Sequence, residues 1–240
     1  MKRFFQCYVL TGLILLAIIV RCAAQTSQPD IVLIYMDDMG YGDVDAYGGI
    51  GYTTPNIDKL AAQGMRFTNF YSAQPICSAS RAAILTGCYP NRIGIYGALM
   101  PLSPIGLSDK EETIAGMLKK KGYTTMIIGK WHLGDAQKFL PLQHGFDQYF
   151  GLPYSNDMWP VNYDGKPFTD TDTTKARAKW PPLRLIEGNK TVRYIKTFAD
   201  QDMLTTWYTQ RAVKVIAQHR DKPFFLYFAQ SMVHVPLGVS

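Results

Sequence analysis

Two short clusters of reactive side chains stand out in the sequence. The segment 77–81 places Cys77 four positions before Arg81, and Asp37 and Asp38 follow an apolar run, 31–36. Adjacent carboxylates repel each other unless a positive group lies beside them, and hard cations such as calcium or magnesium prefer oxygen ligands. A solvated turn is the alternative for such a short motif. After a buried strand, the pair favours a metal site.

The spacing of Cys77 and Arg81 favours anion chemistry. If Cys77 opens a helix, its side chain lies near backbone N–H groups that favour a thiolate or a bound sulfate or phosphate. Arg81 can hold a tetrahedral oxyanion through paired hydrogen bonds. The alternatives are an inert buried cysteine and a solvated arginine. Only three residues separate the two, which excludes the Cys-x5-Arg loop of cysteine-dependent phosphatases.

A disulfide between Cys77 and Cys88 is the simplest interpretation of two cysteines in an exported protein. A helix over the intervening residues would separate them by roughly 16 Å. Disulfides need Cα atoms within about 7 Å. We therefore expect both cysteines to be free if that helix forms.

The elements around these residues alternate between strands and helices. Apolar runs predict buried strands at 30–36, 123–128 and 224–229, and a further strand is predicted at 65–72. Capping and charge patterns predict helices over 54–64, 111–121 and 200–220. A hairpin is predicted over 183–195. The helical spacing of the last helix predicts these core positions: Leu204, Trp207, Val213, Ile216 and Ala217.

This order predicts an α/β fold with a largely parallel sheet flanked by helices. Sites in such sheets form at the carboxyl ends of the strands. Lys130, His132 and His234 each lie just past a predicted strand end, as do the two aspartates. Lys130 and His132 would point the same way in an extended segment, and could bind an anion and manage a proton. Structural roles are the alternative for all three.

Composition and the first residues indicate one exported globular domain. Residues 1–24 resemble a cleavable signal peptide, with Lys2 and Arg3 before a largely apolar run and small residues at 22–24. Arg21 disfavours both a stable membrane span and a lipoprotein anchor on Cys22. The remaining chain, 25–240, holds 22 basic and 19 acidic residues, a net charge of +3. That charge is too mild for a nucleic-acid-binding protein. A secreted or periplasmic protein is predicted.

Together these motifs resemble the amino-terminal part of a type I sulfatase, a formylglycine-dependent, arylsulfatase-like group within the alkaline-phosphatase-like superfamily. The resemblance runs from about residue 29 to the end. It rests on the following segments: 31–38, 54–58 (Thr-Pro-Asn-Ile-Asp), 77–87, 129–134 (Gly-Lys-Trp-His-Leu-Gly) and 151–155 (Gly-Leu-Pro-Tyr-Ser).

The resemblance implies a role for each candidate residue. Asp37, Asp38 and the modified Cys77 would bind Ca²⁺, with Mg²⁺ as the alternative. A formylglycine-generating or equivalent enzyme would convert Cys77 to an aldehyde, whose hydrate attacks the sulfur of a sulfated small molecule or glycan. Arg81 would hold that hydrate. Three residues would contact the hydrate or the sulfate, the last of them also protonating the departing alcohol: Lys130, His132 and His234.

Two departures accompany the resemblance. Ala79 stands where the family motif usually has proline. The family is also about twice as long, and its later Asp-Asn pair and lysine have no match here, so residues 25–240 are expected to form an incomplete catalytic domain and the chain to be a fragment. A phosphatase or phosphodiesterase of the same superfamily, and a non-catalytic fragment that binds sulfated glycans, are the alternative functions.

Overall fold

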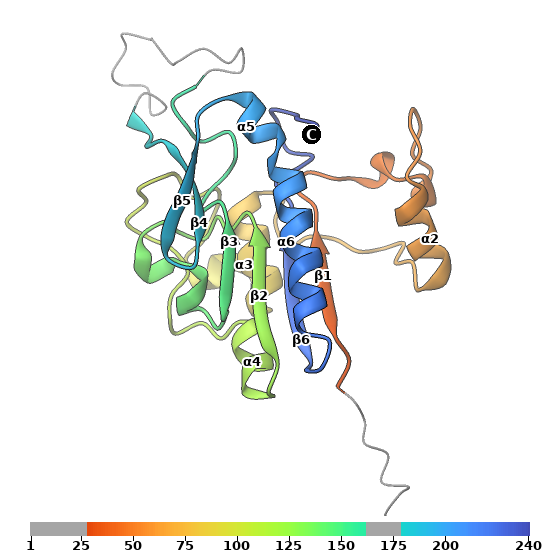
Figure 1. Cartoon of the computed structure of the whole chain (residues 1–240), viewed down its shortest axis with the longest axis horizontal. Helices are drawn as coiled ribbons and strands as arrows, with labels where there is room; N and C mark the ends of the chain where they lie inside the picture. The colour runs from red at the N-terminus through yellow and green to blue at the C-terminus, as the bar shows by residue number, and fades with distance from the viewer. Residues whose placement is uncertain (1–27, 162–178) are drawn as a thin grey trace, which may run out of the picture.

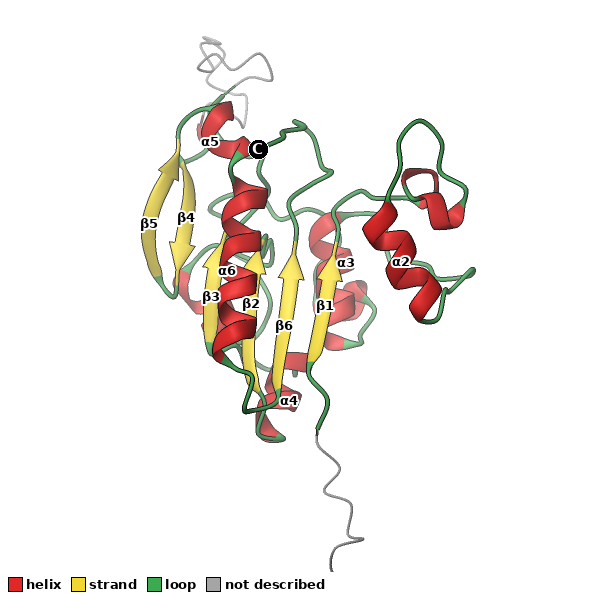
Figure 2. Cartoon of the chain, turned by 45° about the vertical axis from the view of Figure 1, so that its right-hand side comes forward, coloured by secondary structure: helices red, strands yellow, loops and turns green. Residues whose placement is uncertain are grey.

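The computed structural model describes residues 28–161 and 179–240, in which one mixed sheet forms the centre of the fold (Figures 1 and 2). Its strand order is β1-β6-β2-β3-β4-β5. The first four of these run parallel, and β4 and β5 form an antiparallel hairpin at one edge. The strand bounds are β1 Ile31–Tyr35, β2 Thr124–Gly129, β3 Gln148–Gly151, β4 Leu183–Glu187, β5 Lys190–Ile195 and β6 Phe224–Ala229. The predicted α/β fold is confirmed.

Helices cover both faces of the sheet. Figure 2 shows α6 in front of the strands and α3 and α4 behind them, while α2 stands apart beyond β1. The helix bounds are α2 Pro55–Gln63, α3 Cys77–Thr86, α4 Ile114–Lys120, α5 Phe198–Asp202 and α6 Leu204–Gln218. Short 3-10 turns connect them: η1 Tyr41–Asp43, η2 Asp45–Tyr47, η3 Pro90–Ile93, η4 Gln137–Phe139 and η5 Pro141–Gln143.

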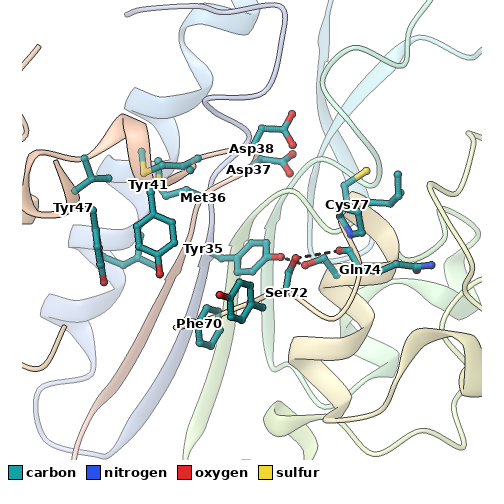
Figure 3. Close-up of a pocket in the computed structure, with 18 of the residues that line it drawn as sticks. Tyr35, Met36, Asp37, Asp38, Tyr41, Tyr47, Phe70, Ser72, Gln74 and Cys77 are labelled. Carbon is teal, nitrogen blue, oxygen red and sulfur yellow. Dashed lines mark hydrogen bonds between the residues drawn. The ribbon is translucent and has the colours of Figure 1, made fainter. Parts of the chain in front are cut away.

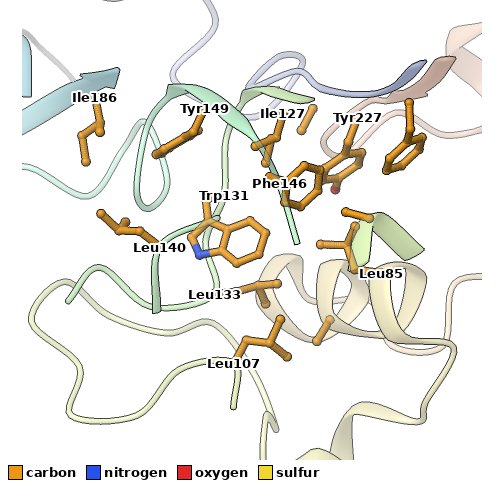
Figure 4. Packing of buried hydrophobic residues seen from close by; sticks show 14 of the residues in the cluster. Leu85, Leu107, Ile127, Trp131, Leu133, Leu140, Phe146, Tyr149, Ile186 and Tyr227 are labelled. Carbon is orange, nitrogen blue, oxygen red and sulfur yellow. The ribbon is translucent and has the colours of Figure 1, made fainter. Parts of the chain in front are cut away.

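The central strands β2 and β6 are buried on both faces, so that alternate residues enter two separate cores. Ile127 and Tyr227 join Trp131 and Phe146 in the core against α3 and α4 (Figure 4). Met126 and its neighbours face α6 in the second core. A strand covered on both faces needs apolar residues at every position, which explains the continuous apolar runs. The sheet therefore holds the carboxyl ends of β1, β6 and β2 side by side.

Two predicted helices differ from those observed. The helix predicted over 111–121 begins only at Ile114, because the Thr113 hydroxyl caps it by accepting a hydrogen bond from Gly116 N. The helix predicted over 200–220 is divided into α5 and α6 at Met203. Of its predicted core positions, Leu204 is buried and Trp207 packs partly buried against the second core, whereas Val213, Ile216 and Ala217 are exposed. The residues that α6 buries are Leu204, Tyr208, Ala212 and Val215.

Two predicted strands also require correction. No strand forms over 65–72, where the chain lies largely exposed and unpaired with any strand of the described sheet. β1 forms as predicted but is not fully buried, since Val32 is 43% and Ile34 53% exposed. Alternate residues of β1 (Ile31, Leu33 and Tyr35) pack against the first core, so Val32 and Ile34 point to the opposite face of the strand, which is not covered to the same extent. The predicted hairpin and the strands at 123–128 and 224–229 are confirmed within one residue.

The structure answers the expectation about the two cysteines. Cys77 and Cys88 are both free, as the intervening helix α3 predicts. Within residues 28–161 and 179–240, no helix combines the length and hydrophobicity that crossing a bilayer requires. The predicted signal peptide, 1–24, lies outside the described residues.

Candidate functional site

Three chain segments bring the predicted site residues together at the carboxyl edge of the parallel strands. The loop after β1 carries Asp37, and the loop after β2 carries Lys130. The first turn of α3 carries Cys77 and, one turn further along, Arg81. Because α3 packs across the face of the sheet, it delivers its amino-terminal end to the place where β1 and β2 end. Residues more than 90 positions apart in the sequence thus meet in one place.

Asp37, Arg81 and Lys130 form a buried charge cluster. Arg81 Nη2 lies 3.4 Å from Asp37 Oδ2, and Lys130 Nζ donates a hydrogen bond to the same oxygen. Arg81 Nη1 also donates to the backbone oxygen of Lys130 at 2.7 Å. Burial opposes ionisation of Asp37, but Arg81 and Lys130 outweigh it, so the pKa of this carboxyl lies below its ordinary value. The three side chains therefore fix one another.

The cluster contains two cations and one carboxylate, which gives it a net charge of +1. Arg81 and Lys130 are both fully buried, and Asp37 is 4% exposed. Burial and the neighbouring Arg81 lower the pKa of Lys130. Arg81 Nε has no hydrogen-bond partner among the described residues. An anion placed beside the cluster would gain both the excess charge and a free donor.

Cys77 lies beside this cluster, at the first position of α3. It lines a cavity of about 730 Å³ together with Asp37 and Asp38, and Figure 3 shows its sulfur across the cavity from the two aspartates. Burial raises the pKa of the Cys77 thiol, although Lys130 and Arg81 act in the opposite direction. The unmodified residue is therefore a neutral thiol at pH 7, and a poor nucleophile.

Asp38 and His234 form the outer part of the site. Asp38 adopts a left-handed backbone conformation, with φ of 61°, and its side chain is 63% exposed. His234 Nε2 lies 3.8 Å from Asp38 Oδ2. His234 Nδ1 donates to Val235 O at 2.6 Å, because a carbonyl oxygen can only accept. This bond leaves Nε2 as the ring nitrogen that faces the acid pair.

His132 is buried near the cluster but is oriented differently from the prediction. Its φ of 60° means that the segment after Lys130 is not extended, so the expectation that both side chains point the same way was wrong. His132 Nε2 donates to Leu99 O at 2.8 Å, and its Nδ1 has no partner among the described residues. Burial, followed by Lys130 and Arg81, holds the pKa of His132 well below its ordinary value. The ring is therefore neutral, with a free acceptor at Nδ1.

Ser155 belongs to the site, although sequence reasoning gave it no role. Its hydroxyl accepts a hydrogen bond from Lys130 Nζ at 2.9 Å, and the residue is fully buried. The only signal was its place at the end of the Gly-Leu-Pro-Tyr-Ser segment that follows β3. A serine carries no charge pattern that predicts such a contact, so its role follows only from the fold.

The carboxylates at this cavity could bind one side of a hard cation. Asp37 and Asp38 supply carboxylate oxygens at the same cavity as Cys77, the oxygen chemistry that calcium and magnesium prefer. Calcium takes six to eight oxygen ligands. In the described ranges no three His, Cys, Asp or Glu side chains gather closely enough to hold a metal. The two aspartates therefore offer the type of ligand that such a cation prefers, and would supply part of its coordination shell.

Comparisons with known proteins identify the family. The sulfatase family model matches residues 29–240. Human N-acetylgalactosamine-6-sulfatase is 41% identical over 226 residues, an alignment that covers 88% of this chain and 41% of the relative. Bovine arylsulfatase A is 40% identical over 234 residues, covering 89% of this chain and 43% of the relative.

Solved sulfatase structures share the fold. The PsFucS1 sulfatase from Pseudoalteromonas sp. superposes with a TM-score of 0.78 at 34% identity, covering 89% of this chain and 46% of that structure. Ps i-CgsB in complex with k-i-k-neocarrahexaose gives 0.71 at 31% identity, covering 88% and 46%. This chain thus spans less than half the length of these relatives. On the match of the family model and on this likeness, the chain belongs to the sulfatase family.

Proposed function

We propose that this chain contributes the nucleophile and the anion-binding half of the active site of a sulfuric ester hydrolase of the arylsulfatase type. The observation that supports it is the buried cluster of Asp37, Arg81 and Lys130, which has an excess positive charge directly beside Cys77. A sulfate ester carries one negative charge on its sulfuryl oxygens. Such a group would neutralise the excess charge that the fold has buried.

The nucleophile in this proposal is formylglycine made from Cys77 by a formylglycine-generating or equivalent maturation enzyme. Hydrated formylglycine supplies an oxygen nucleophile for sulfur. The neutral thiol of unmodified Cys77 supports the need for that conversion. This chain departs from the usual family motif at Ala79, which is fully buried in α3 and does not line the cavity.

The other side chains hold charge and move a proton. Arg81 and Lys130 stabilise negative charge on the transferring group, and Ser155 keeps the Lys130 ammonium in place. His132 Nδ1 accepts a hydrogen bond from a hydroxyl at the nucleophile. One hydroxyl oxygen of hydrated formylglycine bonds to sulfur as the bond between sulfur and the alcohol oxygen breaks, and His234, protonated on both ring nitrogens, gives its Nε2 proton to the departing alcohol oxygen. The second hydroxyl of formylglycine then loses its proton and expels sulfate, which restores the aldehyde, and water hydrates the aldehyde again.

A calcium ion completes the proposal, with magnesium as the alternative. Asp37, Asp38 and the modified Cys77 would hold it, and it would supply positive charge against the sulfuryl oxygens. Lys130 and Arg81 already contact Asp37 in this structure, so this carboxylate would be shared between the cation and the cluster. Asp38 has the more accessible carboxylate of the two.

The substrate in this proposal is a sulfated small molecule or glycan. Relatives of this chain are named as N-acetylgalactosamine-6-sulfatases and arylsulfatases. We further propose that residues 1–24 direct export, so that the protein acts outside the cytoplasm, in a secreted or periplasmic location.

The test combines the mass of the Cys77 peptide with an activity assay. The chain is co-expressed with a formylglycine-generating enzyme, and release of sulfate from 4-methylumbelliferyl sulfate is measured. We expect the peptide mass of an aldehyde, sulfate release by the wild type and none by Cys77→Ala. Cys88→Ala is the matched control, since Cys88 is also free but does not line the cavity.

Three results would contradict the proposal. An active protein whose Cys77 is an intact thiol would remove formylglycine from the mechanism. Faster release of phosphate than of sulfate from the matching esters would favour a phosphatase or phosphodiesterase. Binding of sulfated glycans that is unchanged in Cys77→Ala, with no release of sulfate, would favour a non-catalytic binding protein.

A further inference from the structure

Ser78, the second residue of α3, follows the proposed nucleophile directly in the sequence, and its side chain is fully buried. Ser78 Oγ accepts a hydrogen bond from the backbone N–H of Leu99 at 3.0 Å. Leu99 lies 21 positions further along, in the segment between η3 and α4. The hydroxyl therefore ties the first turn of α3 to a separate loop.

The carbonyl group of the same loop residue holds the ring of His132. Leu99 O accepts a hydrogen bond from His132 Nε2 at 2.8 Å. Leu99 is 7% exposed and His132 is fully buried. Only the two backbone dihedral angles of Leu99 separate its N–H from its C=O group, so the position of one restrains the other. A chain of two buried hydrogen bonds thus connects Ser78 to His132.

This chain determines which ring nitrogen of His132 carries the hydrogen. A carbonyl oxygen can only accept, so Nε2 carries it, and the neutral ring keeps Nδ1 as an acceptor. Nδ1 is buried and has no hydrogen-bond partner among the described residues. Buried polar atoms are almost always hydrogen-bonded in proteins. Nδ1 is therefore the ring atom that is available to a group bound in the site.

The helix that carries the proposed nucleophile also holds the start of the segment 130–132. Arg81 Nη1 donates to the backbone oxygen of Lys130 at 2.7 Å. Ser78 and Arg81 are three positions apart and fully buried, and residues at this spacing lie on the same side of a helix. The segment is thus restrained from α3 at both ends, directly at Lys130 and through the loop residue at His132.

We propose that Ser78 is a positioning residue that acts through Leu99 and holds His132 with Nδ1 free to accept from the nucleophile. The part that Nδ1 plays rests on the proposed function, whereas the hydrogen-bond chain does not depend on it. Removal of the Ser78 hydroxyl leaves the Leu99 N–H buried without an acceptor, and the loop shifts towards another partner. The His132 ring then loses the fixed carbonyl that orients it.

The experiment follows the ring hydrogens of the histidines by NMR, in the unmodified whole chain labelled with ¹⁵N at pH 7. The chain has four histidines, and the spectrum of His132→Gln assigns the signal of His132. Its Nε2–H should exchange slowly with water in the wild type, because it is buried and hydrogen-bonded. In Ser78→Ala this exchange should accelerate about tenfold, the effect of one lost hydrogen bond on a local opening. Ser78→Thr keeps the hydroxyl and should restore slow exchange.

Thr86→Val is the matched control on the same helix. Thr86 Oγ1 accepts a hydrogen bond from Cys88 N at 3.2 Å, at the opposite end of α3. This variant therefore also removes a hydroxyl that accepts from a backbone N–H. It should lower the melting temperature about as much as Ser78→Ala does, and should leave the exchange of the His132 ring hydrogen unchanged.

The protein matured at Cys77 gives a second readout. Per aldehyde formed, Ser78→Ala should lower kcat for 4-methylumbelliferyl sulfate about tenfold and leave KM within twofold, because a misplaced His132 affects the chemical step and not substrate binding. A wild type that releases no sulfate would contradict the proposed function, and the exchange measurement would still decide on the hydrogen-bond chain. Unchanged exchange in a folded Ser78→Ala would overturn the inference, as would equally faster exchange in Thr86→Val.

Discussion

Arg81 Nη2 lies 3.4 Å from Asp37 Oδ2, although the two residues come from α3 and from the loop after β1. Arg81 also lies over the ring of Tyr35 at 5.1 Å from its centroid, and the Tyr35 hydroxyl hydrogen-bonds to Ser80 Oγ at 2.5 Å. The ring that faces the guanidinium is thus itself anchored to α3, the helix that carries Arg81. This contact joins the predicted metal-binding residues to the predicted anion-binding residues.

The two adjacent aspartates should differ sharply in their effect on stability. Asp37→Asn leaves Arg81 and Lys130 buried without their counter-charge, and should reduce the free energy of unfolding by about 3 kcal/mol. Asp38→Asn alters a side chain that is 63% exposed, and should change the free energy of unfolding by less than about 0.5 kcal/mol. Urea unfolding in EDTA measures both. Equal losses for the two variants would contradict the buried cluster.

Addition of a divalent cation should stabilise the wild-type chain. A ligand that binds only the folded state at 100 times its Kd adds about 2.7 kcal/mol. We expect calcium to raise the melting temperature of the wild type, and neither Asp37→Asn nor Asp38→Asn to show the shift, because each removes a proposed ligand. Magnesium is the comparison ion. An identical calcium response in Asp38→Asn would remove that residue from the metal site.

Asp147 should stabilise the fold only above acidic pH. Its carboxylate accepts hydrogen bonds from Thr125 N at 3.0 Å and from Thr125 Oγ1 at 3.1 Å, and pairs with Lys119 at 2.6 Å. Burial would raise the pKa of Asp147, but these contacts outweigh it and lower the pKa from 3.8. The stabilisation is therefore complete at pH values above that of the unfolded carboxyl, and is lost as the pH falls through the folded pKa.

The corresponding measurement compares Asp147→Asn with the wild type across pH. The variant should be less stable by about 1 kcal/mol at pH 7, and the difference should shrink below about pH 4. Asp221→Asn, at an exposed position in the turn before β6, is the control and should show little difference at any pH. A constant difference down to pH 2 would mean that the charge of Asp147 has no part in it.

Gly129 should tolerate no side chain. It precedes Lys130, its φ is 116°, and a Cβ there would lie 1.8 Å from the backbone oxygen of Ala229. Gly129→Ala should cost at least about 3 kcal/mol, because backbone strain and overpacking add. Gly97→Ala meets no atom within 4 Å and should stay within about 0.5 kcal/mol. Circular dichroism during thermal unfolding distinguishes the two, and a stable Gly129→Ala would contradict the close approach of β2 and β6.

The sequence predicted the elements of the sheet well because their signals are local. The continuous apolar run of β6 is typical of a strand covered on both faces, and β6 lies between β1 and β2. The same run in β1 gave no information on its neighbours, so its half-exposed state was missed. The face that α6 buries was also unpredictable. The helix carries apolar residues on more than one side, and the position of the sheet selects among them.

Side-chain directions in the site depended on features that no pattern reveals. His132 turns away from the extended path because its backbone is left-handed, which is uncommon for residues other than glycine. Ser155 reaches Lys130 only because β3 lies beside β2. The convergence of Asp37 and Lys130 was predictable, since the carboxyl ends of parallel strands lie along one edge. The place of Arg81 beside them depends on the packing of α3 against the sheet.

The edge position of β1 has a consequence for the behaviour of this polypeptide in solution. One side of the strand pairs with β6, and on its other side the N–H and C=O groups meet no strand of the described sheet. Exposed Val32 and Ile34 lie on the same strand. An open apolar edge of this kind is a template for pairing with another chain. We therefore expect the 240-residue polypeptide, prepared alone, to self-associate as its concentration rises.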